Sequence, residues 1–292
     1  MTRDVISWIL EELRRAMSEL RDQRLLYHYT NAVGLEGILS SHVIRASNYR
    51  FVNDASELRF GRSVVSGVLD SLIVTFSHRE RELQKVKDML QDGWRDVLDR
   101  EVLDVYITSF CGDVDRLSQW RAYGSRSGRY AIAIEVRRLD GVGLFWPLRV
   151  LYQPDEQRQS VGRVVERILA AADAGQLSIS DVDFALKLRL FELSCRIKHQ
   201  AFREENEWRS IIDASDYDTS ELIRFPPHDV TSPRPFVDLL RGSSEGRRLP
   251  ITAIYVGPSL NQSSNIRFAR DLLERHGYES VEVIVSEIPL SE

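Results

Sequence analysis

Apolar side chains recur along the first twenty residues at spacings of three and four positions, and Glu and Arg side chains occupy much of the remainder. This pattern is typical of an amphipathic helix, because residues three and four apart share one helix face. The predicted helix covers residues 1–22, and its apolar face is formed by Val5, Ile9, Leu13, Met17 and Leu20. We expect it to pack on the rest of the chain; the alternative is that it joins two copies of the chain into a homodimer.

Beyond this helix, residues 23–292 interleave short runs of β-branched and aromatic residues with longer runs of helical periodicity. The short runs predict strands, namely LLYHYT, VIRAS, VYITSFC, RYAIAIEV, LRVLYQ, EWRSIIDA, ITAIYV and VEVIVSEIPL. The periodic runs predict helices over residues 34–41, two over about 55–99, two over about 157–202, and one over 264–277. Because strands and helices do not alternate strictly, the pattern favours a single mixed α+β domain over a doubly wound parallel sheet.

Turn and capping residues set several of the predicted boundaries. Thr30 or Asn31 is suited to cap the helix over 34–41. Ser263 or Ser264 is suited to cap the last helix, and Gly277 is suited to end it. The segment DVDRLSQWRAYGSRSG is predicted to be a loop with one helical turn. An irregular connection is predicted where prolines and a glycine gather, at Pro226, Pro227, Pro233, Pro235 and Gly242.

Composition narrows the class of protein. The chain has 292 residues, of which 43% are hydrophobic and 28% are charged, as in an ordinary soluble globular protein. Its 39 basic and 44 acidic residues leave a net charge of −5, which argues against a surface built throughout for nucleic acid. Cys111 and Cys195 are too few for a disulfide framework or a four-cysteine zinc site. No uninterrupted apolar run is long enough to span a membrane, so we expect a cytoplasmic protein without a membrane segment.

Four polar clusters stand in the predicted strands or at their ends. They are Tyr27-His28-Tyr29-Thr30, Asn53-Asp54 with Glu57, Ser109-Phe110 with Gln119-Trp120-Arg121-Ala122-Tyr123-Gly124, and Glu205-Asn206-Glu207-Trp208-Arg209. Strand alternation places Tyr27 and Tyr29 on one face and His28 on the other. It also gathers the charged side chains of the last cluster on one side. Each cluster alone also fits an ordinary role: a core histidine, a turn and cap, an aromatic core pair, and a solvated strand edge.

Taken in order, these motifs resemble a widespread bacterial family described only as a domain of unknown function. The series runs HYT, ND-x-x-E, SF, W-x-x-Y-G, E-x-E-W-R, a VGP turn and S-x-I-P. It extends from about Tyr27 to Leu290, which is nearly the whole chain apart from the N-terminal helix. This resemblance does not imply an activity, because the family has no assigned function.

A second resemblance does imply an activity. The order of His28, a downstream tyrosine and Glu207 is similar to that of ADP-ribosyltransferases of the His-Tyr-Glu type. In those enzymes a strand ending in His precedes a short helix and a second strand, and a Glu, often in an E-x-E pair, begins a late strand. The resemblance implies an ADP-ribosyltransferase-like split β-sheet core with helical insertions, NAD as the substrate and no metal. Tyr123 and Tyr130 are both candidates for the tyrosine.

The resemblance also implies roles for individual residues. Cleavage of the nicotinamide–ribose bond develops positive charge on the ribose, which a carboxylate at Glu207 would stabilise. Glu205 would help to deprotonate the acceptor, and His28 would hold the adenosine-side ribose. The tyrosine would stack on nicotinamide, Trp120 would extend that platform, and Arg121 or Arg209 would meet the pyrophosphate. The further residues expected to bind NAD are Tyr29, Thr30 and Asn53.

The predicted function is therefore transfer of ADP-ribose from NAD to an unidentified acceptor, which is a protein, a nucleic acid or a small molecule. Similar transferases often act in bacterial toxin or defence systems, and the resemblance implies such a role. Two alternatives use the same pocket: a NAD glycohydrolase with water as acceptor, and a non-catalytic sensor that binds a nucleotide. A metal-dependent nuclease with Asp54, Glu205 and Glu207 as ligands is the least favoured alternative, because these carboxylates are far apart in the sequence.

Overall fold

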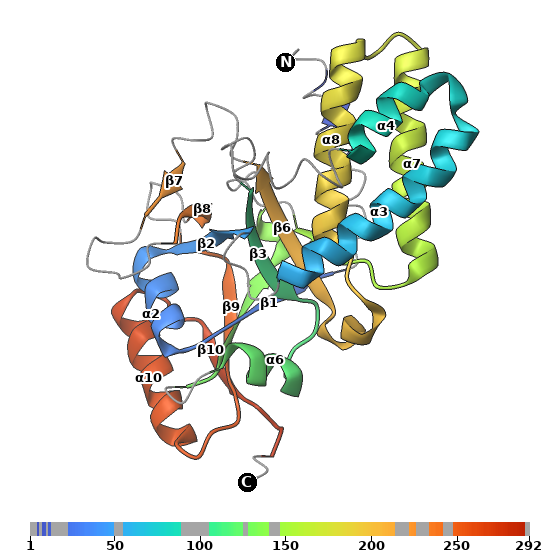
Figure 1. Ribbon diagram of the computed structural model, residues 1–292. Helices are drawn as coiled ribbons and strands as arrows, with labels where there is room; N and C mark the ends of the chain where they lie inside the picture. The colour runs from blue at the N-terminus through green and yellow to red at the C-terminus, as the bar shows by residue number, and fades with distance from the viewer. Residues whose placement is uncertain are drawn as a thin grey trace.

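The computed structural model is mixed α+β (Figure 1). It describes residues 5, 8–9, 11–12, 23–49, 55–88, 105–124, 128–139, 147–213, 222–225, 234–241 and 248–289. Each of the eight runs that were predicted to be strands overlaps a strand in the described part of the chain. The α+β class predicted from the interleaved pattern is confirmed.

A ten-stranded sheet runs through the centre of the described chain. Its strands are β1 (Leu25–Thr30), β2 (Val43–Asn48), β3 (Val105–Cys111), β4 (Tyr130–Glu135), β5 (Pro147–Arg149), β6 (Glu207–Asp213), β7 (Ile223–Arg224), β8 (Phe236–Arg241), β9 (Ile251–Val256) and β10 (Glu282–Val285). The order is β10-β9-β4-β1-β3-β2-β8-β7, and the sheet branches at β3, which also pairs with β6, while β6 pairs with β5. The β9–β10 pair is parallel, and the other pairs are antiparallel.

The helices gather in three places around this sheet (Figure 1). Helices α2 (Ala32–Ser41) and α10 (Gln262–Arg275) lie together against one face. A bundle of four helices, α3 (Ala55–Thr75), α4 (Glu80–Asp88), α7 (Pro154–Asp173) and α8 (Ile179–Arg196), packs beside β3 and β6. The short helix α6 (Leu117–Tyr123) lies against β1. Short 3-10 helices connect these elements, at η3 (Ser77–Arg79), η5 (Val136–Leu139) and η6 (Gln200–Glu205).

The register of β3 against β6 sorts the side chains onto two faces. Residues directly opposite in an antiparallel pair point to the same face, and Phe110 is opposite Trp208 while Cys111 is opposite Glu207. Phe110 and Trp208 belong to the apolar core beneath α2 and α10. On the other face, Ile107 packs against the core of the helical bundle, and Cys111 joins a smaller aromatic core beneath α6. The charged residues of β6 lie on this second face, between those two cores.

Several predicted boundaries need correction. The segment predicted as irregular contains a strand, β8, which lies between Pro235 and Gly242, and the segment begins just after β7; no proline interrupts either strand. The predicted single helical turn near Trp120 is a seven-residue helix, α6. Helix α10 begins at Gln262 after the N-cap position Asn261, earlier than either predicted serine cap. Asn31 does cap α2, because its side chain accepts a hydrogen bond from the Gly34 amide.

The N-terminal segment is described at five helical positions. Val5 and Ile9 are buried in the core of the helical bundle, as expected if this helix packs on the rest of the chain. The remaining apolar positions of the predicted helix lie outside the described residues. Among the described helices, none is by itself both long and apolar enough to cross a membrane, and one bent pair, Glu57–Thr75 with Ser77–Asp88, meets that test by length and composition alone.

Candidate functional site

A cluster of buried charges lies where β6 begins. Glu205 ends η6, Asn206 turns the chain with a left-handed backbone (φ 40°), and Glu207 opens β6. Asparagine is among the few residues other than glycine that adopt this conformation readily. The turn lies against β3, where Gly112 donates a backbone hydrogen bond to the Asn206 carbonyl and the Cys111 thiol donates one to the Glu205 carbonyl. The E-x-E pair is therefore held at the end of β3.

Arg209 is the fixed centre of the cluster. Its guanidinium holds Glu207 through two hydrogen bonds, from Nε to Oε1 at 2.7 Å and from Nη2 to Oε2 at 2.9 Å. The same Nη2 donates to Glu57 Oε2 at 2.6 Å, and Nη1 donates to the Cys195 carbonyl at 2.6 Å. Paired geometry of this kind is the strong form of an arginine–carboxylate interaction. Because Glu57 lies in the first turn of α3, Arg209 joins the helical bundle to the sheet.

Lys198 contacts all three carboxylates. Its Nζ lies 2.7 Å from Glu57 Oε1, 2.5 Å from Glu205 Oε2 and 3.4 Å from Glu207 Oε2. Its backbone is anchored two residues past the end of α8, where its amide donates to the Leu151 carbonyl. With three carboxylates and two cations, the cluster carries one excess negative charge when all five groups are ionised.

The two glutamates of the E-x-E pair have opposite pKa shifts. Burial alone would raise the pKa of Glu207, but Arg209 and Lys198 outweigh it and lower that pKa to about 2. Burial raises the pKa of Glu205, and Lys198 offsets this only in part. Glu207 is therefore firmly ionised at neutral pH, whereas Glu205 holds a proton more readily than an ordinary glutamate does.

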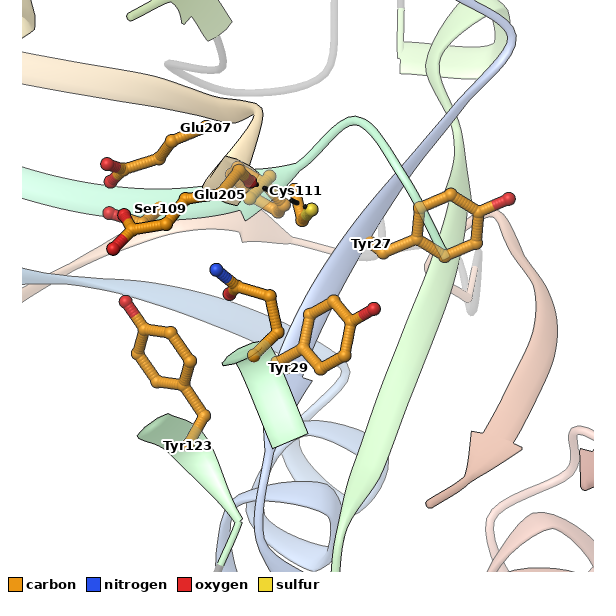
Figure 2. A pocket seen from close by; sticks show the side chains of 9 residues that line it. Tyr27, Tyr29, Ser109, Cys111, Tyr123, Glu205 and Glu207 are labelled. Atoms are coloured by element: carbon orange, nitrogen blue, oxygen red, sulfur yellow. Dashed lines mark hydrogen bonds between the residues drawn. The ribbon is translucent and has the colours of Figure 1, made fainter. Parts of the chain in front are cut away.

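A narrow cavity opens beside this pair (Figure 2). It is lined by Tyr27, Tyr29, Ser109, Phe110, Cys111, Gln119, Tyr123, Glu205 and Glu207. The cavity has a volume of about 10 Å³ for the centre of a water molecule, which is about the space of one water molecule, and its empty volume including the open mouth is about 260 Å³. Figure 2 shows the Tyr123 hydroxyl directed toward the two glutamate side chains. Burial, with the charge of Glu207, raises the pKa of Tyr123 to about 12, so its hydroxyl stays protonated.

The aromatic side of the cavity is supported from behind. The Tyr29 ring packs edge-on against Trp120, with ring centroids 4.7 Å apart. The Trp120 indole donates to Asp115 Oδ1 at 2.8 Å, and the same carboxylate accepts from the Ser286 hydroxyl and the Glu287 amide. The segment after β10 thus ties down the loop that carries α6.

The structure brings four of the predicted site residues to this cavity: Glu205, Glu207, Tyr29 and Tyr123. Arg209 lies directly behind Glu207. Of the two candidate tyrosines, Tyr123 lines the cavity, whereas Tyr130 is fully buried in the core beneath α2 and α10.

His28 lies apart from this cavity. Alternation along β1 turns it to the face opposite Tyr27 and Tyr29, and its ring packs against Phe110 with centroids 5.5 Å apart. Its Nδ1 is 3.2 Å from the Ser109 carbonyl, and burial lowers its pKa. The predicted contact of His28 with a ribose stays a prediction.

The other predicted binding residues have varied positions. Thr30 is half-buried on the same face as His28. Trp120 is buried behind Tyr29 and does not line the cavity. Arg121 is exposed on α6, and Asn53 lies outside the described residues.

Sequence reasoning did not place Lys198, Ser109, Tyr27 or Gln119 in the site. Lys198 follows the long helix α8 and carries no motif, so only the fold brings it to Glu205. Glu57 belongs to the ND-x-x-E motif, and that motif was a usable signal for its place in the cluster. Gln119 stands in the segment before W-x-x-Y-G, where its spacing of four from Tyr123 predicts a shared helix face.

Comparison with known proteins finds a partial match to one family, whose description names no activity. A family model described as "Protein of unknown function (DUF2971)" matches residues 119–210, from α6 to the middle of β6. This match supports the expected resemblance to a domain of unknown function. No curated protein and no solved structure matches the chain. Within the described residues, no three His, Cys, Asp or Glu side chains are grouped so that they could hold a metal ion.

Proposed function

We propose that this protein is a transferase that cleaves the nicotinamide–ribose bond of NAD and transfers ADP-ribose to an acceptor. The observation that carries the proposal is the pair of glutamates at one cavity, of which Glu207 has a lowered pKa and Glu205 a raised one. Two carboxyl groups with separated pKa values are the usual arrangement for acid–base chemistry at a glycosidic bond. The bond between nicotinamide and ribose is of that kind.

Glu207 has the properties of an electrostatic stabiliser. It is 5% exposed, held in one orientation by Arg209, and ionised. The cluster around it keeps an excess negative charge when Glu205 is ionised, and Glu207, Arg209 and Lys198 are all buried. A fixed negative charge in such a place favours the positive charge that develops on the ribose as the C–N bond lengthens.

Glu205 has the properties of a general base. Its raised pKa makes it a better proton acceptor than an ordinary glutamate. In the proposed reaction the electron pair of the C–N bond leaves with the nicotinamide nitrogen. A lone pair on the oxygen or nitrogen of the acceptor forms the new bond to the ribose carbon, and Glu205 takes the proton of the acceptor. Atoms and charges balance without a further reactant.

The aromatic residues would surround the leaving ring. A pyridine ring needs more enclosed space than one water molecule, so a wall of the cavity must move to admit it. Among the side chains that line the cavity, Tyr123 is the one best able to move, because it is 39% exposed and ends the short helix α6. In the proposed complex the ring stacks on Tyr123, and its departure reopens the path to the acceptor.

Purified protein incubated with NAD tests this proposal, with released nicotinamide measured by chromatography, alone and with cell extract. The proposal expects release by the wild type and a loss of at least a hundredfold in Glu207→Gln, which keeps the shape and removes the charge. Glu166→Gln, an exposed position on α7, is the matched control and should keep full activity. Release of nicotinamide that depends on extract would indicate that an acceptor in the extract receives the ADP-ribose. Release without extract would identify water as the acceptor. Absence of release under both conditions would overturn the proposal.

A further inference from the structure

Gln119 is a buried amide that faces the cavity without a protein partner. The side chain is 7% exposed and lines the cavity beside Tyr29 and Tyr123. Within the described part of the chain no hydrogen bond to its amide group is found, and its amide atoms are not among the fully buried polar atoms that lack a partner, so the cavity gives access to them. An amide that is open to a cavity and has no protein partner can hydrogen-bond to a molecule that enters the cavity. A ligand in the cavity would supply the missing partner.

We propose that Gln119 binds the carboxamide group of nicotinamide and so makes the site selective for a primary amide on the pyridine ring. This inference rests on the proposed cleavage of NAD. A glutamine side chain offers two N–H donors and one oxygen acceptor. A primary carboxamide offers the same set, so the two groups can pair through two hydrogen bonds. A carboxylate in the same position offers acceptors only and leaves the Gln119 oxygen unpaired.

The placement of Gln119 agrees with this role. It lies four positions before Tyr123 in α6, so the two side chains share one face of the helix. Tyr123 reaches toward Glu205 and Glu207 (Figure 2). A nicotinamide ring stacked on Tyr123 would therefore have its ribose end near the carboxylates of Glu205 and Glu207. Gln119, in the same wall of the cavity, would bind the carboxamide of that ring.

The fixed position of α6 makes such a contact selective. Trp120, the residue next to Gln119, is 1% exposed and is held by the Asp115 carboxylate. Gly124 ends the helix with a hydrogen bond from its amide to the Trp120 carbonyl at 3.1 Å. A side chain carried on an anchored helix loses little freedom when it binds, so its hydrogen bonds contribute to selection between substrates.

The experiment compares NAD with nicotinic acid adenine dinucleotide, which carries a carboxylate where NAD carries the carboxamide. Release of the free base from each is measured as kcat/KM for the wild type, Gln119→Leu and Gln119→Glu. Gln159→Leu, an exposed position on α7, makes the same chemical change away from the cavity and is the control. Binding of nicotinamide and of nicotinate alone is measured in parallel by ligand-observed NMR, which does not depend on turnover.

The two variants should change selectivity in opposite directions. Gln119→Leu should lose about tenfold in kcat/KM for NAD and most of its preference over the carboxylate analogue, because two hydrogen bonds are lost. Gln119→Glu should reject the carboxylate analogue more strongly than the wild type does, because two like charges would meet. A change in folding alone would not produce opposite shifts in selectivity.

The outcomes separate this inference from the function on which it rests. Unchanged selectivity in both variants, with normal release from NAD, would overturn the role of Gln119 and leave the proposed function standing. No base release by the wild type, with nicotinamide still bound in preference to nicotinate and that preference lost in Gln119→Leu, would overturn the function but support the contact. Should Gln119→Leu fail to fold, as judged by thermal denaturation, Gln119→Glu decides the question by the same comparison.

Discussion

The buried glutamate of the charge cluster should make the stability of this protein depend on pH in a defined way. The structural cause is the lowered pKa of Glu207, which burial would raise but which Arg209 and Lys198 bring down to about 2. A carboxyl group with a folded-state pKa near 2 and an unfolded-state pKa near 4.5 contributes about 3 kcal/mol to stability at pH 7, because each tenfold change in acidity corresponds to about 1.36 kcal/mol. The contribution is fully present above the unfolded-state pKa and is lost as pH falls toward 2.

Glu207→Gln is the variant that isolates this contribution. It removes the charge and keeps the side-chain shape, and Arg209 keeps its hydrogen bond to Glu57. We expect the variant to be about 3 kcal/mol less stable than the wild type at pH 7. At pH 3 the difference should shrink to about 1 kcal/mol, because the wild-type carboxylate then loses most of its advantage over the unfolded state. A typical domain has about 5–15 kcal/mol of stability, so the variant should still fold.

Urea denaturation followed by circular dichroism at pH 7 and pH 3 measures both differences. Glu166→Gln is the control for loss of an exposed carboxylate and should match the wild type at both pH values. The raised pKa of Glu205 works in the opposite direction, but it is present in both proteins and largely cancels in the comparison. An equal loss of stability at pH 7 and pH 3 would refute the reasoning, because it would mean that the effect of the substitution does not depend on the ionisation of Glu207.

Two further predictions concern how the helices are held. Gly61→Ala places a Cβ only 2.0 Å from the Ser194 carbonyl, where α3 crosses α8, and should lower the free energy of unfolding by about 2 kcal/mol or more. Gly67→Ala in the same helix meets open space and should raise it by about 0.5–1 kcal/mol, so equal effects of the two substitutions in urea denaturation would contradict the close packing. Asp115→Asn weakens the acceptor shared by Trp120, Ser286 and Glu287, and should cost about 1.5–3 kcal/mol by the same assay. An Asp115→Asn protein with an unchanged urea midpoint would show that this contact does not hold α6.

Eight of the ten described strands could be predicted because the sequence around each carries a β-branched or alternating pattern. The pair β7 and β8 was missed because the prolines around it suggested an irregular segment, although those prolines lie between the strands. Helix α6 was underestimated because it is short and its N-cap residue, Arg116, makes no side-chain capping bond. Local sequence signals therefore predicted most elements, and they failed beside the prolines that precede β8 and at the short helix α6.

The candidate site was predicted in part. The E-x-E pair could be named from its motif, Tyr123 could be named only together with Tyr130, and strand alternation already separated His28 from Tyr27 and Tyr29. The resemblance nevertheless gave His28 a place in the same site, whereas the structure leaves it packed on Phe110 on the other face. Lys198 could not be predicted, since its approach to Glu205 depends on where α8 ends in space. Contacts between distant segments are set by the tertiary fold, and one sequence carries little direct signal of them.

The pH dependence of NAD cleavage tests the central claim. The claim is that two carboxyl groups with separated pKa values act together at one cavity, Glu207 as the charged stabiliser and Glu205 as the base. We predict that kcat/KM of the wild type rises with pH along a limb whose midpoint lies above the ordinary glutamate pKa, because the base form of Glu205 is the active one. In Glu205→Gln that limb should vanish and the remaining rate should be low at every pH. A Glu205→Gln profile that superimposes on the wild-type profile, or a wild type without cleavage at any pH, would contradict the account.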